Sequence, residues 1–473
     1  MAFNSLPFIG FFGVILLLHF LLPTKGRWIL LLSASVLFYL LFVPAYLLVV
    51  ATIIAIDYVV AIKLESPVNG RRLKFYYLVA IITNVAILVF FKYFNFLNTN
   101  ITVLLSLVQI KNPIPYLEFI LPLGISFSTF QSVGYLADVR SGKIKAERHL
   151  GYYSLFILFF PHIGSGPIAR ASHLMPQIHL AQTAQRSDLA AGFSQALLGF
   201  FKKVVVGDLL GNYVDVFYRS YEQFSGFAIL FACWIFLFQL YADFSGYTDI
   251  ATGCARMLGY RLHINFSLPL FSKTMTELWR RWHISLSTWL RDYLFTPMAI
   301  AYRDWGIYSV VFSQLVTFAI CGLWHGAGWQ FIIYGLIHGV YLVSEFLLKI
   351  RSSFYNKNFF RKCLGVFITF NLLSLSLIFF RSPGFTKVNS MFQGIFTRFL
   401  PVKVRIFDPA FFVAMVGVLA VLLAIEYFLL RDLSFDSLYQ KMPKTLLAVN
   451  LLLLILIVLF GVSSSTQFIY YQF

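Results

Sequence analysis

The sequence contains few charged residues and few cysteines. Charged side chains make up 12% of its 473 residues, about half of the roughly 25% that soluble domains carry. Hydrophobic residues make up 59%, and the mean hydropathy is +0.79. A soluble globule of this size would lack the polar side chains to cover its surface, and a disordered chain is excluded. The four cysteines form no CxxC pair, which argues against a disulfide scaffold and a metal site.

The motifs of several enzyme classes are also absent. The chain has no P-loop, no GxGxxG motif after a strand, no HExxH zinc motif and no GxSxG nucleophile elbow. His325 and His338 are 13 residues apart, which is not the spacing of two metal ligands on one helical turn. We therefore expect no metal site and no bound cofactor.

The apolar residues occur in unbroken runs of about 20 residues, the length of a membrane-spanning helix. A transmembrane barrel would instead show alternating segments of about ten residues. The sequence thus predicts an all-α polytopic membrane protein, with about eleven transmembrane helices plus re-entrant and interfacial helices. We expect one integral membrane domain, 1–473, and a loop with a surface helix at 95–115. The candidate spans are 7–23, 28–43, 45–63, 76–95, 116–137, 151–168, 188–206, 225–244, 307–324, 329–348, 363–380, 409–430 and 445–462.

The net charge of +18 comes from 37 basic and 19 acidic residues. Basic residues gather in short loops beside the apolar runs, where they set topology and face anionic headgroups. No long basic segment stands free to hold a duplex, so we expect membrane lipids and no nucleic acid as partners. The loop charges place 64–75 and 139–149 in the cytoplasm and 1–6 outside. The segment 349–362 is expected to be a cytoplasmic loop as well, whereas the basic loop expected at 381–407 leaves the parity of the last spans open.

Chemistry is expected between residues 160 and 345, which hold seven of the nine histidines. The segment 279–293 has aromatic and leucine side chains spaced 3, 4, 3 and 4, which predicts one face of a helix. This helix is too charged to span, so we expect it at an interface or on the floor of a cavity, with Arg280 and Arg291 toward water. An interfacial anchor explains its tryptophans and arginines but not His283, which is therefore a candidate functional residue. The face consists of Trp279, Trp282, Leu286, Trp289 and Tyr293.

A glycine-rich segment, 321–329, separates two apolar runs and contains His325. A lone histidine on an apolar helix is usually a hydrogen-bonded core residue. Here the glycines predict a broken or kinked helix, and irregular backbone at membrane depth occurs only inside protein or beside water. A buried neutral imidazole suits a general base near neutral pH, so His325 is the second candidate.

Two carboxylates, Asp243 and Asp249, end the apolar run at 225–244, and Ser245 lies between them. They could bind a cation, orient a histidine, cap a helix that begins near Asp249, or pair with Arg256 or Arg261. Capping or ion pairing is the interpretation that we favour.

Proline and glycine also break the apolar run at 151–168. The segment 160–170 could open a path for substrate. His162 within it could equally make a simple polar contact.

Together these segments resemble the membrane-bound O-acyltransferase (MBOAT) family, and within it the bacterial branch that contains the alginate O-acetyltransferases. The resemblance covers nearly the whole chain. Six motifs carry it, and the last two in chain order are the most specific. The six motifs are Phe3-Asn-Ser, Leu121-Pro-Leu-Gly-Ile-Ser-Phe, Gly166-Pro167, Tyr241-Ala-Asp-Phe-Ser-Gly, Arg280-Arg-Trp-His-Ile-Ser and Leu323-Trp-His-Gly.

The resemblance implies a helical bundle around a central tunnel, entered by an acyl donor from the cytoplasm and by an acceptor from outside. His325 matches the family's near-invariant histidine, the expected general base. His283 matches its second characteristic histidine, which is an asparagine in other branches. His283, with Trp282 or Arg281, would stabilise the oxyanion or orient the donor, and a covalent acyl-histidine or acyl-serine route stays open. The remaining candidates for contacting substrate or donor are Trp324, Ser285, Asp243 and Ser245.

The implied activity is transfer of an acyl group, acetyl in this branch, from a cytoplasmic thioester such as acetyl-CoA to hydroxyls of an extracytoplasmic polysaccharide. Transfer would be direct or would pass through a periplasmic SGNH-type acetyltransferase, and the enzyme would lie in the bacterial cytoplasmic (inner) membrane. One alternative is D-alanyl transfer to teichoic acid from a carrier-protein thioester. The other is a lipid or polysaccharide translocator without chemistry, which would need charged residues across most spans.

Overall fold

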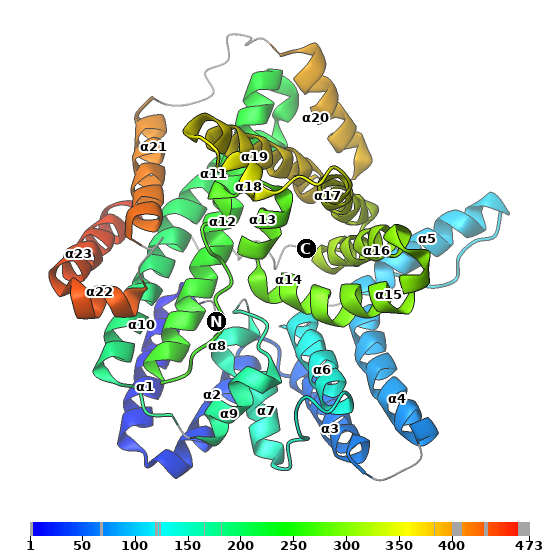
Figure 1. Cartoon of the computed structure of the whole chain (residues 1–473), viewed down its shortest axis with the longest axis vertical. Coiled ribbons are helices and arrows are strands. Elements are labelled where there is room, and N and C mark those ends of the chain that lie inside the picture. The colour runs from blue at the N-terminus through cyan, green and yellow to red at the C-terminus, as the bar shows by residue number, and fades with distance from the viewer. Residues whose placement is uncertain are drawn as a thin grey trace. The chain divides into compact units, whose positions relative to one another are not determined.

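The computed structural model describes residues 3–66, 70–118, 122, 124–164, 166–180, 182–382, 384–399, 409–429 and 434–461. Within these ranges every regular element is a helix (Figure 1), which confirms the predicted all-α class. The expected motif at 121–127 lies partly outside the described residues.

The predicted polytopic membrane protein is confirmed by the lengths and composition of the helices. Eight helices in the described residues are long and apolar enough to cross a membrane, fewer than the eleven expected. Three shorter apolar helices, Leu6–Leu21, Leu150–Ile163 and Phe412–Tyr427, accompany them. The eight are Tyr46–Leu64, Gly70–Leu107, Arg186–Arg219, Gly226–Met257, Ile307–His325, Trp329–Leu347, Phe359–Arg381 and Pro443–Phe460.

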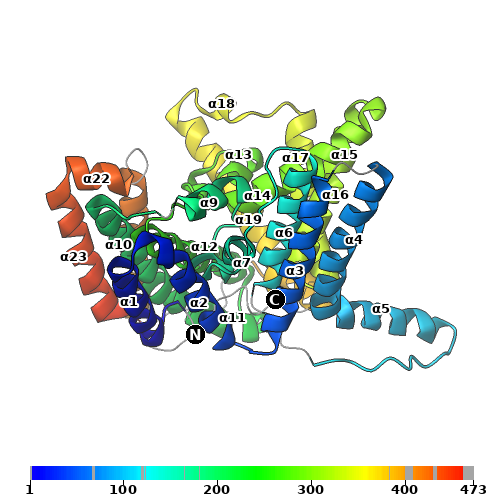
Figure 2. The ribbon, with the colours of Figure 1, turned by 90° about the horizontal axis from the view of Figure 1, so that it is seen from below.

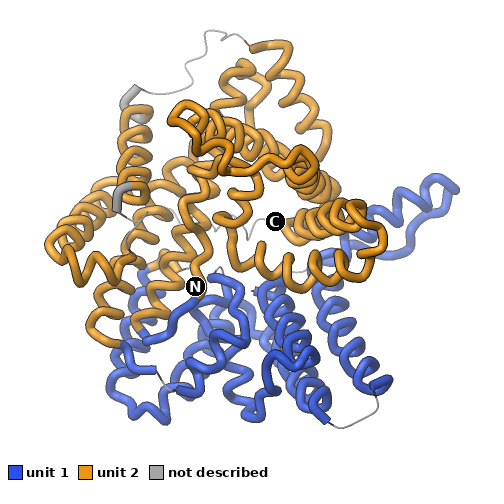
Figure 3. Tube along the Cα trace, viewed as in Figure 1, with its two compact units in different colours: residues 1, 6–184, 258–262 blue, residues 2–5, 185–257, 263–473 orange. Residues whose placement is uncertain are grey.

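The chain divides into two compact units, coloured separately in Figure 3. Unit 1 comprises residues 1, 6–184 and 258–262, and unit 2 comprises residues 2–5, 185–257 and 263–473. The expected single domain over 1–473 stays a prediction.

Unit 1 is built from nine α-helices in its described residues. Helices α3, α4 and α6 lie side by side (Figure 2), and the Asn84 amide of α4 donates a 2.8 Å hydrogen bond to the buried Asp57 carboxylate of α3. The surface helix expected within 95–115 is present as α5, which continues α4 through a π-helical segment. The elements are α1 Leu6–Leu21, η1 Thr24–Gly26, α2 Arg27–Leu40, α3 Tyr46–Leu64, α4 Gly70–Leu88, η2 Val89–Tyr93, α5 Phe94–Leu107, α6 Ile125–Arg140, α7 Leu150–Leu158, α8 Phe160–Ile163 and α9 Ala171–His179.

Unit 2 contains the remaining elements, and its helices α16 and α17 run side by side (Figure 1). The elements are α10 Arg186–Phe200, η3 Phe201–Gly207, α11 Asp208–Arg219, η4 Tyr221–Gln223, α12 Gly226–Met257, η5 Pro269–Phe271, α13 Met275–Arg281, α14 Ile284–Leu290, η6 Arg291–Phe295, α15 Thr296–Ala301, η7 Arg303–Trp305, α16 Ile307–His325, α17 Trp329–Leu347, α18 Ser352–Tyr355, α19 Phe359–Arg381, α20 Phe385–Thr397, α21 Pro409–Ala424, η8 Ile425–Leu429, α22 Phe435–Lys441 and α23 Pro443–Phe460.

Paired glycines bring the backbones of α10 and α12 into contact. A Cβ atom at Gly199 would lie 2.6 Å from the Gly246 carbonyl oxygen, and one at Gly246 would lie 2.8 Å from that of Gly199. Gly192 and Gly253 repeat the arrangement seven residues away on each helix, at 2.7 and 2.5 Å. Small residues let helices approach this closely in a membrane, where packing rather than hydrophobic burial drives association.

Two expectations about unit 2 are wrong. Helix α12 runs unbroken through Asp249, so no helix begins there. The segment expected to be a loop, 381–407, contains helix α20 instead. Val388, Met391 and Ile395 of α20 are buried at helical spacing, and this apolar face stabilises a helix despite the basic residues around it.

Candidate active site

The aromatic segment 279–293 is not one continuous helix. Helix α13 ends at Arg281, and α14 begins at Ile284. Between them His283 has φ 45° and ψ 53°, the left-handed conformation that costs a non-glycine residue about 1–3 kcal/mol. The predicted orientation is confirmed, because Trp279, Trp282, Leu286 and Trp289 are buried while Arg280 and Arg291 are exposed.

Asn265 holds the break between α13 and α14 in place. Its backbone oxygen accepts a 2.9 Å hydrogen bond from the Ile284 N–H. Its side-chain oxygen accepts from the Ser285 N–H at 3.1 Å and the Ser285 hydroxyl at 2.9 Å, and it lies 3.2 Å from the Nδ1 atom of His283. Since an amide oxygen only accepts, Nδ1 of His283 carries the proton.

The tautomer leaves the Nε2 atom of His283 as a hydrogen-bond acceptor. This atom is buried and has no hydrogen-bond partner among the described residues. Burial lowers the pKa of His283 to about 3, so the ring is neutral near pH 7. An oxyanion stabiliser must donate a hydrogen bond, and this tautomer therefore does not suit the oxyanion role expected for His283.

Aromatic rings enclose His283. The Phe244 ring of α12 contacts its edge at a centroid separation of 4.7 Å, and the Trp324 ring of α16 lies 5.7 Å away. Trp282 packs against Phe266 and Tyr241, at centroid separations of 5.3 and 6.0 Å. These ring contacts hold Trp282 in the core of unit 2.

His325 is the last residue of α16 and is 4% exposed. Its ring contacts Trp324 at 4.9 Å and Phe380 at 5.4 Å, and its Nε2 atom lies 3.9 Å from the Cys321 sulfur. The chain turns extended at Gly326, and a Cβ atom there would clash with the Phe331 ring. The glycine break predicted beside His325 is confirmed.

Trp324 connects the two candidate histidines, since its ring contacts both His283 and His325. His338 is in a different position, because both of its ring nitrogens have partners. Nδ1 accepts from the Trp279 indole at 3.3 Å, and Nε2 lies 3.0 Å from the Ser376 hydroxyl. Its full hydrogen bonding makes His338 a structural residue of the core.

The acidic candidate Asp243 lies in a buried ion pair. Its carboxylate is 2.5 Å from the Lys203 ammonium, which also pairs with Asp208 at 2.8 Å. Ion pairing is thus confirmed, with a lysine as partner, and the pairing expected with Arg256 is wrong. Arg256 pairs with Asp188 and Asp436 instead.

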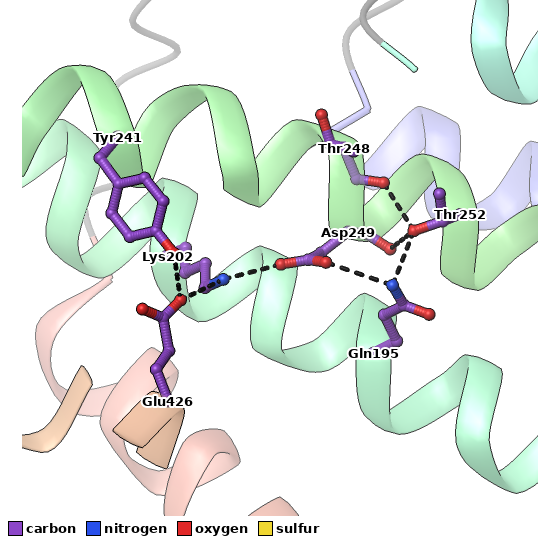
Figure 4. Close-up of polar contacts among 7 residues, drawn as sticks. All are labelled: Gln195, Lys202, Tyr241, Thr248, Asp249, Thr252 and Glu426. Atoms are coloured by element: carbon purple, nitrogen blue, oxygen red, sulfur yellow. Dashed lines mark hydrogen bonds and ion pairs between the residues drawn. The ribbon is translucent and has the colours of Figure 1, made fainter. Parts of the chain in front are cut away.

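Asp249 belongs to a second, largely buried cluster, drawn in Figure 4. Lys202 of η3 lies between Asp249 at 2.9 Å and Glu426 at 2.7 Å (Figure 4). The Tyr241 hydroxyl donates to Glu426 at 2.6 Å, and Gln195 donates to Asp249 at 3.2 Å. These contacts neutralise the Lys202 charge inside a candidate span.

The other candidates divide between site and scaffold. Ser285 belongs to the site, because its backbone N–H and its hydroxyl both donate to the Asn265 side-chain oxygen. Arg281 pairs with Glu277 at 3.0 Å and donates to the Ser267 carbonyl at 3.1 Å, so its guanidinium braces the segment before His283. The Ser245 hydroxyl is buried without a hydrogen-bond partner among the described residues.

The fourth candidate segment belongs to unit 1. His162 is 1% exposed, and its Nε2 atom lies 3.1 Å from the Phe156 carbonyl oxygen and 3.4 Å from the Gln131 amide. These contacts match the simple polar role considered for it. The proline-induced break is confirmed, because α7 ends at Leu158 and α8 begins at Phe160.

Sequence reasoning missed Asn265 and the two adjacent lysines, Lys202 and Lys203. The lysines were detectable, because they lie inside the apolar run 188–206, where ionisable residues are rare and are paired. Asn265 carried no comparable signal. It acts through residues about 20 positions later in the chain.

Comparison with known proteins shows which family the chain resembles. Residues 147–385 match the model of the membrane-bound O-acyltransferase family. A probable alginate O-acetylase of Azotobacter vinelandii is 33% identical over 400 residues, covering 84% of this chain and 78% of that protein. A peptidoglycan O-acetyltransferase of Helicobacter pylori is 31% identical over 428 residues, covering 83% and 78%. A teichoic acid D-alanyltransferase of Streptococcus thermophilus is 32% identical over 284 residues, covering 54% and 68%.

The extent of these matches, together with the helical membrane architecture, agrees with the resemblance seen in the sequence. The chain therefore belongs to the membrane-bound O-acyltransferase family and is a multi-pass membrane O-acyltransferase.

Proposed function

We propose that the enzyme transfers an acetyl group from acetyl-CoA on the cytoplasmic side to hydroxyls of an extracytoplasmic polysaccharide, in the bacterial cytoplasmic membrane. The acceptor receives the acetyl group directly or through a periplasmic SGNH-type partner. Relatives that cover more than four fifths of the chain include a probable alginate O-acetylase and a peptidoglycan O-acetyltransferase, which supports a polysaccharide acceptor.

One observation carries the proposal. Two buried histidines, His283 and His325, both lie against the ring of Trp324, at centroid separations of 5.7 and 4.9 Å. A water-excluding site of this kind favours acyl transfer to a hydroxyl over hydrolysis of the thioester.

The reaction balances with His325 as its base. The imidazole takes the proton of the acceptor hydroxyl, and the oxygen attacks the thioester carbonyl carbon. The carbon–sulfur bond then breaks, and the leaving thiolate takes the proton back from His325. General-base assistance of this kind contributes a factor of roughly 10²–10⁴ in rate. His283, whose Nε2 atom is an acceptor, orients the donor.

The test measures acetate released by mild alkali from purified polymer after incubation of membranes with labelled acetyl-CoA. Alginate and peptidoglycan are offered separately. We expect His325→Gln to lower transfer by roughly 10²–10⁴-fold, at equal amounts of monodisperse protein. His338→Gln is the matched control, because His338 is buried in the same unit but both its nitrogens are engaged. Near-normal transfer by the His325 variant would remove His325 from the mechanism.

Teichoic acid D-alanylation is the second candidate, supported by a relative that matches only 54% of the chain. It predicts ester-linked D-alanine from a carrier-protein thioester and no transfer from acetyl-CoA. The translocator alternative predicts that polymer crosses the membrane unmodified.

A further inference from the structure

We propose that helix α5 and the segment that follows it, 108–118, form an arm that lies along the extracytoplasmic face of the membrane and inserts its apolar side among the lipid acyl chains. The residues of this arm all belong to unit 1, and none of them takes part in the proposed reaction.

The helix that contains α4 and α5 is too long to lie within one membrane core. With η2 it runs from Gly70 to Leu107, 38 residues, or about 57 Å at 1.5 Å per residue. Helix α4 alone has 19 residues, about 28 Å, which already matches the ~30 Å hydrocarbon core. Helix α5 therefore begins where the core ends, and it leaves the end of α4 sideways (Figure 2). Since the basic loop 64–75 before α4 is expected in the cytoplasm, this end is the extracytoplasmic one.

The polar side of α5 is covered by the segment that follows it. Asn95 exchanges two hydrogen bonds with the backbone of Leu117, donating at 2.7 Å and accepting at 3.0 Å. The buried Asn98 side chain donates to the Ile114 carbonyl oxygen at 3.2 Å and accepts from the Asn112 amide at 2.6 Å. These bonds hold the returning segment against one side of α5 and satisfy both amide groups.

The other side of α5 is apolar and exposed. Leu97, Ile101 and Leu104 are spaced four and three residues apart, which places them on one helical face. They are 46%, 40% and 64% exposed. The helix continues a candidate span that itself presents apolar side chains outward, since Ile82 and Val85 of α4 are also exposed. An apolar face that begins at the end of a span fits the boundary between lipid headgroups and acyl chains.

The charge of α5 specifies which part of the lipid it contacts. The helix contains no Asp, Glu, Lys or Arg, so it offers no ionic contact to a headgroup or to a charged protein surface. Its attraction to the membrane comes from apolar burial. We therefore expect lipid contact of equal extent in vesicles of phosphatidylcholine with and without phosphatidylglycerol, and at low and high salt.

The experiment labels single cysteines of the full-length enzyme with the fluorophore NBD in phosphatidylcholine vesicles. Cys363→Ser removes the exposed native cysteine, and the other three are buried. Leu104→Cys probes the apolar side, and Ser106→Cys probes the opposite, also exposed side. At Leu104 we expect blue-shifted emission, quenching by nitroxide-bearing lipid and protection from iodide supplied on both sides of the membrane. At Ser106 we expect quenching by iodide and little by the lipid.

A charge on the apolar side provides a second measurement. Ile101→Asp should lower the lipid quenching of the label at Leu104, because a carboxylate among acyl chains is costly. Ser106→Asp is the matched control and should leave that quenching unchanged. Equal effects of the two substitutions would overturn the proposal.

The quenching pattern also distinguishes the other positions that the arm could take. Iodide quenching at both Leu104 and Ser106 would place the arm in water. Lipid quenching at both would place α5 inside the hydrocarbon core. A label at Leu104 that neither quencher reaches would show that protein covers the apolar side, either a second copy of the chain or another partner. Each of these three results would overturn the proposal.

Discussion

Lys203 tests how buried charge stabilises unit 2. Its Nζ atom lies 2.8 Å from Asp208 and 2.5 Å from Asp243, and the three side chains are 1%, 2% and 4% exposed. Lys203→Met keeps much of the aliphatic stem but removes the ammonium that pairs with both buried carboxylates. Removing one member of a buried ion pair costs about 3–5 kcal/mol. We expect a loss of about this size in the free energy of unfolding.

The assay is reversible unfolding in mixed micelles with rising SDS, followed by tryptophan fluorescence. Lys143→Met is the control, because Lys143 is 63% exposed and pairs with Asp138 at 3.4 Å, an interaction worth about 0–1 kcal/mol. The triple variant Lys203→Met, Asp208→Asn, Asp243→Asn removes all three charges, so we expect it to recover part of the loss. This reasoning would be refuted if Lys203→Met and Lys143→Met lowered the free energy of unfolding equally. A triple variant that is less stable than Lys203→Met would also refute it.

Three further predictions concern the site and its supports. Trp282→Ala should lower the free energy of unfolding by about 3–5 kcal/mol, because Trp282 packs against two aromatic rings. Arg291 is exposed, so Arg291→Ala should change this free energy by about 0.5 kcal/mol or less. A larger loss for the Arg291 variant in the same assay would contradict the orientation of the segment. Gly246→Val should reduce the yield of folded protein on size-exclusion chromatography, because its Cβ atom would meet the α10 backbone at 2.8 Å, and Gly417→Val, with open space around it, should not. The pKa of His283 falls from 6.5 to about 3 on folding. As the pH drops, the unfolded state therefore binds the proton first, and stability declines below about pH 6.5. The stability of His283→Asn, measured by thermal unfolding, should decline less between pH 6.5 and 4, and a decline equal to that of the wild type would place the titration elsewhere.

Local features of the sequence predicted much of the architecture. The apolar runs gave the spans, and the glycines beside His325 gave the end of α16, because both depend on neighbours within a few residues. The conformation of His283 was not predictable in this way. It depends on Asn265, 18 residues earlier, and that contact overrides the continuous helical pattern of the aromatic residues.

The ion pairs were unpredictable for the same physical reason. Asp243 and Asp249 pair with lysines about 40 residues earlier, whereas the sequence suggested arginines nearby. Helix α20 was missed because its basic neighbours obscured an apolar face of three residues. Charge near a helix indicates where lipid headgroups lie, but burial of one face decides whether the helix forms.

The adjacent lysines of η3 have a consequence for biosynthesis. A lysine at the centre of a membrane segment costs about 2.5–3.5 kcal/mol during insertion, and this segment carries two. Their partners on α12 leave the ribosome about 40 residues later, which takes about 2–8 s at 5–20 residues per second. Glu426 follows more than 200 residues after Lys202. We therefore expect the segment α10–α11 to enter the bilayer together with α12, whose Asp243 and Asp249 pair with the two lysines.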